Sequence, residues 1–273
     1  MKAVARDRYG SLDVLQLKDV ERPKPGPGEV LVRVRAAGVD PSVWHLTAGR
    51  PYLIRLMGFG LRRPKRPVPG LDLAGTIEET GPGVTEFRAG EQVFGTADGS
   101  FAEYVTVKTS RVVPMPDRLT FDQAAAVPVS ARTAAQAVAT VHSGQQVLII
   151  GAGGGVGTYA VQLVKARGAH VTGVCSTAKV DLVKSLGGEG GGKLVGSVAR
   201  TLRAALLSPF VSQQLKGLMA TAERREDLLE LRRLIEQDVI APVLDRTFPL
   251  ADAVAAIRYV QAGKALGKVV ITT

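Results

Sequence analysis

Short apolar or alternating runs, separated by turn residues, dominate roughly the first 120 residues. Alternation of apolar and polar residues is typical of strands with one buried face, and regular turns indicate successive hairpins. The pattern predicts an all-β module, either a small barrel or a sandwich. The runs occupy residues 14–17, 30–35, 72–78, 92–95 and 101–107, with glycine- and proline-rich turns at 23–28 and 81–83.

The pattern becomes helical after Thr120, whose hydroxyl can cap a helix that begins at Phe121. A second, alanine-rich helix is predicted over 132–140. The following segments predict a buried parallel strand at 147–150, a helix over 158–167, a second strand over 171–175 and a helix over 180–186. Strand, glycine turn, helix and strand is the arrangement of a dinucleotide-binding unit.

A glycine-rich turn joins the first of these strands to its helix. Glycines let the backbone approach a pyrophosphate, and the helix N-terminus offers free N–H groups and a positive dipole end. The alternative is an ordinary strand–helix turn whose glycines serve close packing. The candidate cofactor residues here are Gly151, Gly153, Gly154, Gly155, Val156 and Gly157.

A run of glycines at 187–192 interrupts the pattern after this unit. The last part predicts a helix over 228–237, a strand over 239–244, a helix over 250–262 and a strand over 268–273. We therefore expect an α/β protein with three regions: a β module at 1–122, a nucleotide-binding region at 123–222, and a C-terminal return to the first region at 223–273.

Composition narrows the partners and the compartment. The net charge of +10 raises nucleic acid as a partner, but the cations are dispersed apart from a cluster at 62–66, and no nucleic-acid-binding motif accompanies them. A solvated basic surface that also attracts a phosphorylated cofactor is favoured. No apolar run is long enough to span a membrane, and the N-terminus has no signal-peptide core. We expect a cytoplasmic protein with neither a nucleic acid nor a membrane partner.

Several motifs along the chain together resemble one family, the zinc-independent, quinone-oxidoreductase-like branch of the medium-chain dehydrogenases/reductases. The resemblance implies a GroES-like β-barrel catalytic domain, a Rossmann domain, hydride transfer from a nicotinamide cofactor to a quinone or an α,β-unsaturated carbonyl, and a homodimer. The similar stretches are 26–34, 38–41, 69–75, 90–95, 126–128, the glycine turn and 267–270.

This branch differs from its zinc-dependent relatives in lacking their metal ligands. Those relatives carry a cysteine ligand after the second barrel strand and a His–Glu pair where this chain has Leu71 and Asp72. The single Cys175 also excludes a cysteine zinc cluster. We therefore expect no metal, and a substrate carbonyl polarised by hydrogen bonds instead.

The end of the second predicted strand indicates the choice of cofactor. A fold selective for NAD places an acidic residue there, roughly 20 residues after the glycines. This chain instead has Ser176, Thr177 and Lys179, and its first carboxylate, Asp181, follows inside a helix. Hydroxyls and an ammonium suit a 2′-phosphate, so NADP is the expected cofactor. Alternatively, Ser176 or Thr177 caps the helix and Lys179 is solvated.

The resemblance also implies candidate catalytic residues. Trp44, His45 and Tyr52 are expected to line the substrate cleft, and Thr133 to approach the nicotinamide. A lone histidine is more often structural than catalytic, and Thr133 could be a hydroxyl at a helix N-terminus.

The chain departs from the family after the helix at 180–186. The third to fifth strands and a helix, roughly 40–50 residues in total, are absent before the glycine run. Of the sheet, the first two strands are expected to remain, together with a sixth at 215–221. By resemblance, Gly190 and Gly191 belong to a loop beside the nicotinamide. We expect hydride transfer to be weakened or absent, and an impaired relative that binds only nucleotide or a partner is the alternative.

Overall fold

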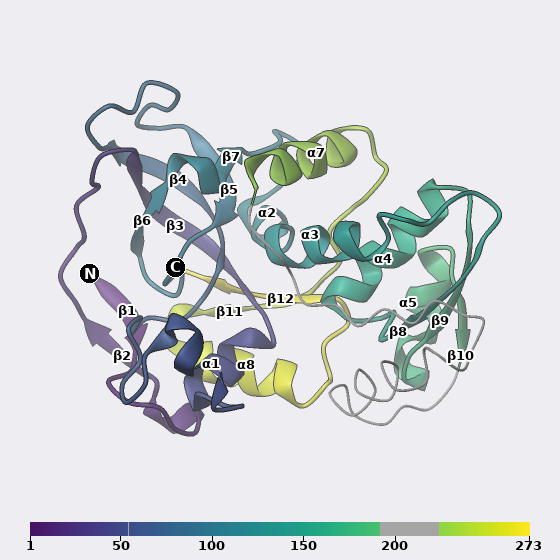
Figure 1. Ribbon diagram of the computed structural model, residues 1–273, viewed down its shortest axis with the longest axis horizontal. Helices are drawn as coiled ribbons and strands as arrows, with labels where there is room; N and C mark the ends of the chain where they lie inside the picture. Colours follow the sequence, from purple (N-terminus) through teal and green to yellow (C-terminus); the bar gives the residue numbers. More distant parts are fainter. Residues whose placement is uncertain (54, 192–223) are drawn as a thin grey trace. The chain divides into compact units, whose positions relative to one another are not determined.

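The computed structural model describes residues 1–53, 55–191 and 224–273 of the 273-residue chain. Two compact units divide it. The first comprises Met1–Ser130 together with Glu223–Thr273, and the second comprises Ala131–Ala222 (Figure 1).

A seven-stranded sheet organises the first unit, with the order β11-β12-β3-β4-β5-β7 and β6 paired with β3. The long strand β3 is central because β4 lies along one edge, while β6 and β12 share the other edge. All pairs are antiparallel except β11 with β12. The strands are β3 (Glu29–Val39), β4 (Asp72–Thr80), β5 (Gln92–Thr96), β6 (Tyr104–Lys108), β7 (Val112–Pro114), β11 (Leu244–Pro249) and β12 (Lys268–Thr272).

A separate two-stranded sheet pairs the N-terminal strand β1 (Lys2–Ala5) with β2 (Gln16–Asp19). A 3-10 turn, η1 (Leu12–Val14), precedes β2, and an isolated bridge joins Ala3 to Ala102. The strand predicted at 14–17 therefore lies two residues further along the chain, at Gln16–Asp19.

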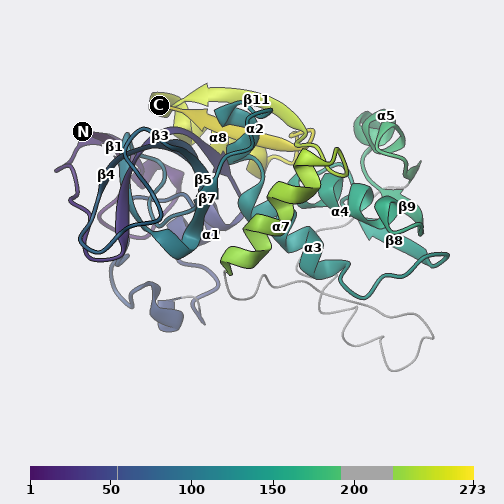
Figure 2. The same cartoon turned by 90° about the horizontal axis from the view of Figure 1, so that it is seen from above.

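Helices cover this sheet because their apolar faces match its apolar side. Helix α8 (Ala253–Gln261) lies beside β11 and β12 in both views (Figures 1 and 2) and buries Ala253, Ala256 and Ile257. Helix α7 (Arg225–Glu236) packs near β7, and α1 (Ser42–Ala48) follows β3 directly. The predicted cap is confirmed: Thr120 and Gln123 form a capping box at the start of α2 (Phe121–Ala125). Helix α3 (Pro128–Ala137) carries the chain into the second unit.

Three parallel strands in the order β10-β9-β8 form the sheet of the second unit. They are β8 (Gln146–Ile150), β9 (His170–Val174) and β10 (Glu189–Gly191), with helices α4 (Gly155–Ala166) and α5 (Val180–Ser185) between them. Gly173 of β9 permits close packing, because a Cβ there would lie 2.6 Å from Cγ1 of Val183 on α5.

Three sequence expectations are wrong, two in this second unit and one at β11 of the first unit. Gly190 and Gly191 are not in a loop: they lie in β10 and pair with Gly173 and Val174, so a short third strand is present. Strand β8 is parallel but not buried, because it ends the described sheet and leaves Leu148 and Ile150 61% and 49% exposed. The strand expected at 239–244 begins only at Leu244. The sixth strand expected at 215–221 lies outside the described residues.

Candidate functional site

The glycine turn is fixed by the end of β9. The N–H groups of Gly151 and Ala152 both donate to the carbonyl of Val174, at 2.8 and 3.2 Å, and Gly154 N donates to Gly151 O at 3.0 Å. Gly151 has φ of 86°, a left-handed conformation that favours glycine. At Gly157 a Cβ would lie 2.1 Å from Gly151 O, so a glycine is required where α4 crosses the turn.

Helix α4 presents its N-terminus at this turn. Its cap is Gly154, which has no side chain to satisfy the first amides, and Thr158 N is bonded back to Gly154 O. By helix geometry the N–H groups of Gly155, Val156 and Gly157 have no intrahelical acceptor. Three amide donors at the positive end of a helix dipole fit a phosphate.

The predicted 2′-phosphate residues lie beside the same turn. Ser176 and Thr177 are exposed, and Lys179 ends the 3-10 turn η4 (Thr177–Lys179). Lys179 packs across the glycines, since a Cβ on Gly153 would lie 2.8 Å from Cβ of Lys179. Ser176 makes no side-chain capping hydrogen bond, so the capping alternative is wrong for this residue. The structure thus brings the glycine turn and Lys179 together in one unit.

Gly190 and Gly191 lie at the other side of β9 from β8, because β10 pairs with β9. This position follows from the shortened sequence: the glycine run comes directly after α5 and therefore takes the place of a third strand. The expectation of a loop is wrong, and a cofactor contact by these glycines stays a prediction.

Helix α1 positions two of the candidate catalytic side chains. The rings of Trp44 and His45 lie 5.4 Å apart at 38°, with Trp44 half-buried against the core and His45 exposed. Tyr52 follows α1, is 63% exposed, and has the Arg55 guanidinium 4.9 Å from its ring centroid. Thr133 belongs to the second unit and lies inside α3, so it is not a hydroxyl at the helix N-terminus.

A buried ionic cluster in the first unit was missed by the sequence reasoning. Lys268 Nζ donates to Asp40 at 2.5 Å, to Asp72 at 2.7 Å and to Ser130 Oγ at 3.1 Å, and Asp72 also accepts the Val129 N–H at 2.7 Å. Both carboxylates and the ammonium are nearly inaccessible to solvent. The signal was present, because Asp40, Asp72 and Lys268 are each the charged residue within one of the quoted motifs.

Burial and charge shift the protonation of this cluster. Burial, with the nearby Asp40 carboxylate, raises the pKa of Asp72 to about 7. Burial alone would lower the pKa of Lys268, but the two carboxylates outweigh it and the pKa is raised. Oδ2 of Asp40 has no hydrogen-bond partner among the described residues. The cluster joins the segment before α1, the start of β4, the start of α3 and β12, and therefore positions α1 relative to the sheet.

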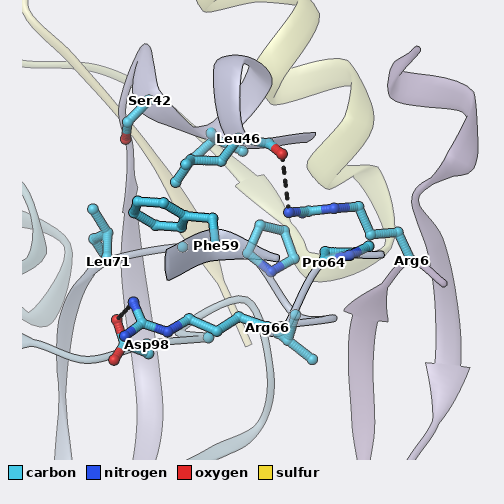
Figure 3. Close-up of a pocket in the computed structure, with 13 residues that line it drawn as sticks. Arg6, Ser42, Leu46, Phe59, Pro64, Arg66, Leu71 and Asp98 are labelled. Carbon is cyan, nitrogen blue, oxygen red and sulfur yellow. Dashed lines mark hydrogen bonds and ion pairs between the residues drawn. The ribbon is translucent and has the colours of Figure 1, made fainter. Parts of the chain in front are cut away.

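A small pocket in the first unit lies under α1 (Figure 3). Its walls are largely apolar, with Leu46, Phe59 and Leu71 among them, and it has about 30 Å³ of room for water-sized molecules. Four polar or charged residues line it, namely Arg6, Ser42, Arg66 and Asp98, and the last two are paired with each other. Arg6 is buried and donates to Leu46 O at 3.2 Å, and burial lowers the pKa of its guanidinium. The buried hydroxyl of Ser42 has no partner within the described part of the chain. Such groups can donate to the oxygen of a small ligand.

Neither a metal centre nor a membrane span is found in the described parts of the chain. No group of three histidine, cysteine, aspartate or glutamate side chains gathers in a way that could hold a metal ion there. None of the helices described combines the length and the apolar character needed to cross a bilayer.

Two family models match the sequence. Residues 26–117 match the alcohol dehydrogenase GroES-like domain, and residues 162–271 match the zinc-binding dehydrogenase family. The chain is 35% identical over 205 residues to a chloroplastic quinone-oxidoreductase homolog of Spinacia oleracea, and this match covers 69% of the chain and 60% of that protein. It is 36% identical over 183 residues to the quinone oxidoreductase of Sus scrofa, over 65% of the chain and 53% of that protein. The chain thus spans little more than half the length of these relatives.

A longer match bears on the expected deletion. The 2-methylene-furan-3-one reductase of Solanum lycopersicum is 29% identical over 313 positions, covering 99% of this chain and 79% of that protein. Because this chain has 273 residues, at least 40 of those positions have no counterpart in it. This number agrees with the total shortening expected from the sequence.

Solved structures share the fold. A quinone oxidoreductase from Coxiella burnetii superimposes with a TM-score of 0.87 at 25% identity, covering 100% of this chain and 99% of that chain. A mycobacterial protein solved in complex with NADPH superimposes with a TM-score of 0.82 at 23% identity over the full length of both chains, and shows the fold alone. These findings confirm the α/β class, with a GroES-like domain and a Rossmann-like domain. The chain therefore belongs to the medium-chain dehydrogenase/reductase superfamily, and its relatives include proteins named quinone oxidoreductases.

Proposed function

We propose that this protein is a zinc-independent oxidoreductase that transfers a hydride from NADPH to a quinone or an α,β-unsaturated carbonyl. The observation that carries the proposal is the packing of Lys179 across the glycine turn, beside the free amides of α4. The names of the relatives support the reaction class, since they include quinone oxidoreductases and an enone reductase.

The second unit offers the groups that a phosphorylated dinucleotide requires. Amides of Gly155, Val156 and Gly157 would hold the pyrophosphate, and Lys179 with Ser176 would hold the 2′-phosphate. An ammonium and a hydroxyl stand where an NAD-selective site has a carboxylate, which favours NADPH over NADH. A bound NADPH supplies the hydride; the chain's own residues bind and orient it.

The first unit offers the substrate side. The pocket under α1, with about 30 Å³ of room, can admit the carbonyl end of a substrate, whose oxygen can accept hydrogen bonds from Ser42 Oγ and Arg6. Such donors stabilise the negative charge that develops on that oxygen when a hydride arrives. Trp44, His45 and Tyr52 remain candidates for the rim of this site. Thr133, on α3, remains the candidate residue near the nicotinamide.

The buried cluster supports independence from zinc. Asp72, at the position of the acidic ligand of zinc-dependent relatives, is hydrogen-bonded to Lys268, and Leu71 before it offers no ligand atom. An ammonium within 2.7 Å of both carboxylates already satisfies the charge that a metal ion would neutralise.

A second candidate function is nucleotide binding without turnover. It is favoured by the described sheet of the second unit, which contains three strands and ends at β8. A Rossmann sheet normally places further strands beyond the first, and their carboxyl ends contribute to the nicotinamide half of the site. The shortened chain could therefore keep the adenosine half of the site and lose the other.

One experiment separates the two functions. NADPH oxidation is followed with a panel of small quinones and enones, with a chelator present throughout, beside thermal unfolding with and without NADPH. Turnover under these conditions is the expected result of the proposed function. Protection by NADPH with no turnover identifies the nucleotide-binding alternative, and the absence of both contradicts the two functions. Light scattering of the same sample tests the homodimer that we infer from the family.

A further inference from the structure

The segment at residues 50–66, which follows α1, combines positive charge with exposed apolar side chains. It contains six cationic residues and no aspartate or glutamate. The net charge of the whole 273-residue chain is +10, so this short segment carries a large share of it. The cationic residues are Arg50, Arg55, Arg62, Arg63, Lys65 and Arg66. This concentration of one sign of charge in 17 residues defines a strongly basic surface.

Four large apolar side chains of this segment project into solvent. Tyr52, Leu53, Leu56 and Leu61 are 63%, 64%, 70% and 63% exposed. Single exposed leucines are common on soluble proteins, but a group of them within ten residues usually marks a binding surface.

The exposed side chains are not needed to attach the segment to the core, because other residues of the segment already do so. The Tyr9 hydroxyl donates to Phe59 O at 2.8 Å, and Arg55 Nε donates to Gly49 O at 3.0 Å. Phe59 and Pro64 line the pocket under α1, as Figure 3 shows. The backbone is thus held to the first unit with Phe59 inward and the leucines outward.

Most of these cationic side chains also form no ion pair with the described residues. Arg66 is paired with Asp98 at 2.6 Å, and Arg55 stacks on Tyr9 with 4.3 Å to the ring centroid. Arg50, Arg62, Arg63 and Lys65 are exposed, and within the described residues none of these four forms an ion pair. Their charge is available to a partner.

We propose that segment 50–66 is a docking surface for an anionic lipid bilayer. Leucine and tyrosine side chains enter the boundary between headgroups and acyl chains, while arginine and lysine stay with the phosphates. A nucleic acid would engage the cations but would leave the leucines in water. The charge complementarity therefore selects an acidic bilayer surface as the partner. This departs from the sequence expectation of no membrane partner, which rested on the lack of a bilayer-spanning run.

Docking here has a consequence for the substrate, and this consequence rests on the proposed function. Phe59 and Pro64 of the same segment line the pocket that we assign to the carbonyl compound. A quinone dissolved in the bilayer would then meet the protein at the segment that borders its pocket.

Vesicle flotation tests the docking surface without reference to turnover. The full chain is mixed with phosphatidylcholine vesicles, with and without phosphatidylserine, and the phosphatidylserine sample is repeated at about 1 M salt, where the screening length falls to about 3 Å. We expect binding to the phosphatidylserine vesicles, a marked loss at high salt, and little binding to phosphatidylcholine alone.

Paired variants locate the surface. Arg62→Gln with Arg63→Gln is expected to lower the partition coefficient about 30-fold, since each basic residue contributes about fivefold. Leu53→Ser with Leu56→Ser is expected to lower it by at least tenfold, because the insertion of apolar groups is lost. The control pair Arg88→Gln with Lys108→Gln, exposed at other sites, should change it less than the arginine pair. Circular dichroism confirms that each variant is folded.

Several outcomes overturn the proposal. No binding to phosphatidylserine vesicles overturns it directly, as does binding that both variant pairs retain. Tighter binding to a short DNA duplex than to vesicles, lost in the arginine pair and kept in the leucine pair, would identify a nucleic-acid surface instead. A protein that binds vesicles but has no turnover keeps the docking surface and contradicts the proposed activity.

Discussion

Lys268 links three separate segments of the first unit through its buried ammonium. Its ammonium contacts groups from β4, from the segment before α1 and from the start of α3, and it does so without solvent. A buried ion pair is not in itself a large source of stability, because desolvation offsets the Coulomb attraction. Removing one member is costly, however, because the remaining charges stay buried.

Replacement of this lysine measures that cost. Lys268→Met should lower the free energy of unfolding by about 3–5 kcal/mol, because Asp40 and Asp72 would share a dry site without a cation. Urea denaturation of the variant gives the value. Lys264→Met, at an exposed position four residues earlier, should change it by less than about 0.5 kcal/mol. Equal effects of the two substitutions would show that the cluster does not contribute to the stability of the first unit.

The raised pKa of Asp72 predicts how the stability of the protein depends on pH. Its pKa rises from 3.8 to about 7 in the folded protein, so between these values the folded state binds more protons than the unfolded state. The contribution of this carboxyl to stability is therefore greatest at low pH and is lost as the pH rises toward 7, at up to about 1.4 kcal/mol per pH unit.

Denaturation curves between pH 5 and 7.5 test this sign. The free energy of unfolding of the unaltered protein should fall more steeply with rising pH than that of Asp72→Asn, which cannot titrate. The raised pKa of Lys268 has no part in this window, because its proton is lost only at higher pH. Equal slopes for the two proteins across this window would show that the pKa of Asp72 is not raised.

At the scale of elements, local signals predicted well and non-local ones did not. The helix cap at Thr120 and the strand–turn–helix at 146–166 depend on neighbouring residues, so the sequence specified them. Gly190 and Gly191 were misplaced because the family resemblance assigned them to a loop, whereas pairing with β9 makes them a strand. The ionic cluster joins residues up to 228 positions apart, and such separations are not visible in a local pattern. The sequence likewise predicted the chemistry of Lys179 but not its closeness to Gly153, which follows only from the fold.

Packing at the start of α4 gives a prediction for this element. Gly157→Ala should destabilise the second unit by about 1–3 kcal/mol, because the new Cβ would lie 2.1 Å from the backbone oxygen of Gly151. Gly154→Ala is the matched control, since its Cβ would lie 3.4 Å from the same oxygen. Thermal unfolding followed by far-ultraviolet circular dichroism compares them. An alanine at 157 that is tolerated as well as one at 154 would contradict the packing described for the turn.

At the scale of the whole molecule, shortening of the chain leaves an apolar sheet edge. Leu148 and Ile150 of β8 are exposed, and no described strand pairs with the free side of β8. An exposed, unpaired and apolar strand tends to pair with another chain. We therefore expect the protein to associate with itself more readily than a relative with a full sheet.

Leu148→Lys should reduce this association, because a charge on the exposed face of β8 opposes the approach of a second strand. Light scattering over a range of protein concentrations provides the measurement. Leu229→Lys, at a 42% exposed position on α7, is the control and should leave the association unchanged. Identical scattering by the unaltered protein and Leu148→Lys would show that β8 is not the contact.

We propose that the second unit retains a phosphate-binding half-site selective for NADPH. Titration followed by nicotinamide fluorescence, with NADPH and NADH in parallel on the unaltered protein and on Lys179→Ala, tests it most directly. Lys184→Ala, on the exposed side of α5, is the control. We expect saturable binding of NADPH, weaker binding of NADH, and a loss of NADPH affinity of about tenfold or more in Lys179→Ala alone, the size of one charge-assisted hydrogen bond. An NADPH dissociation constant that Lys179→Ala leaves unchanged, or no binding at all, would contradict the account.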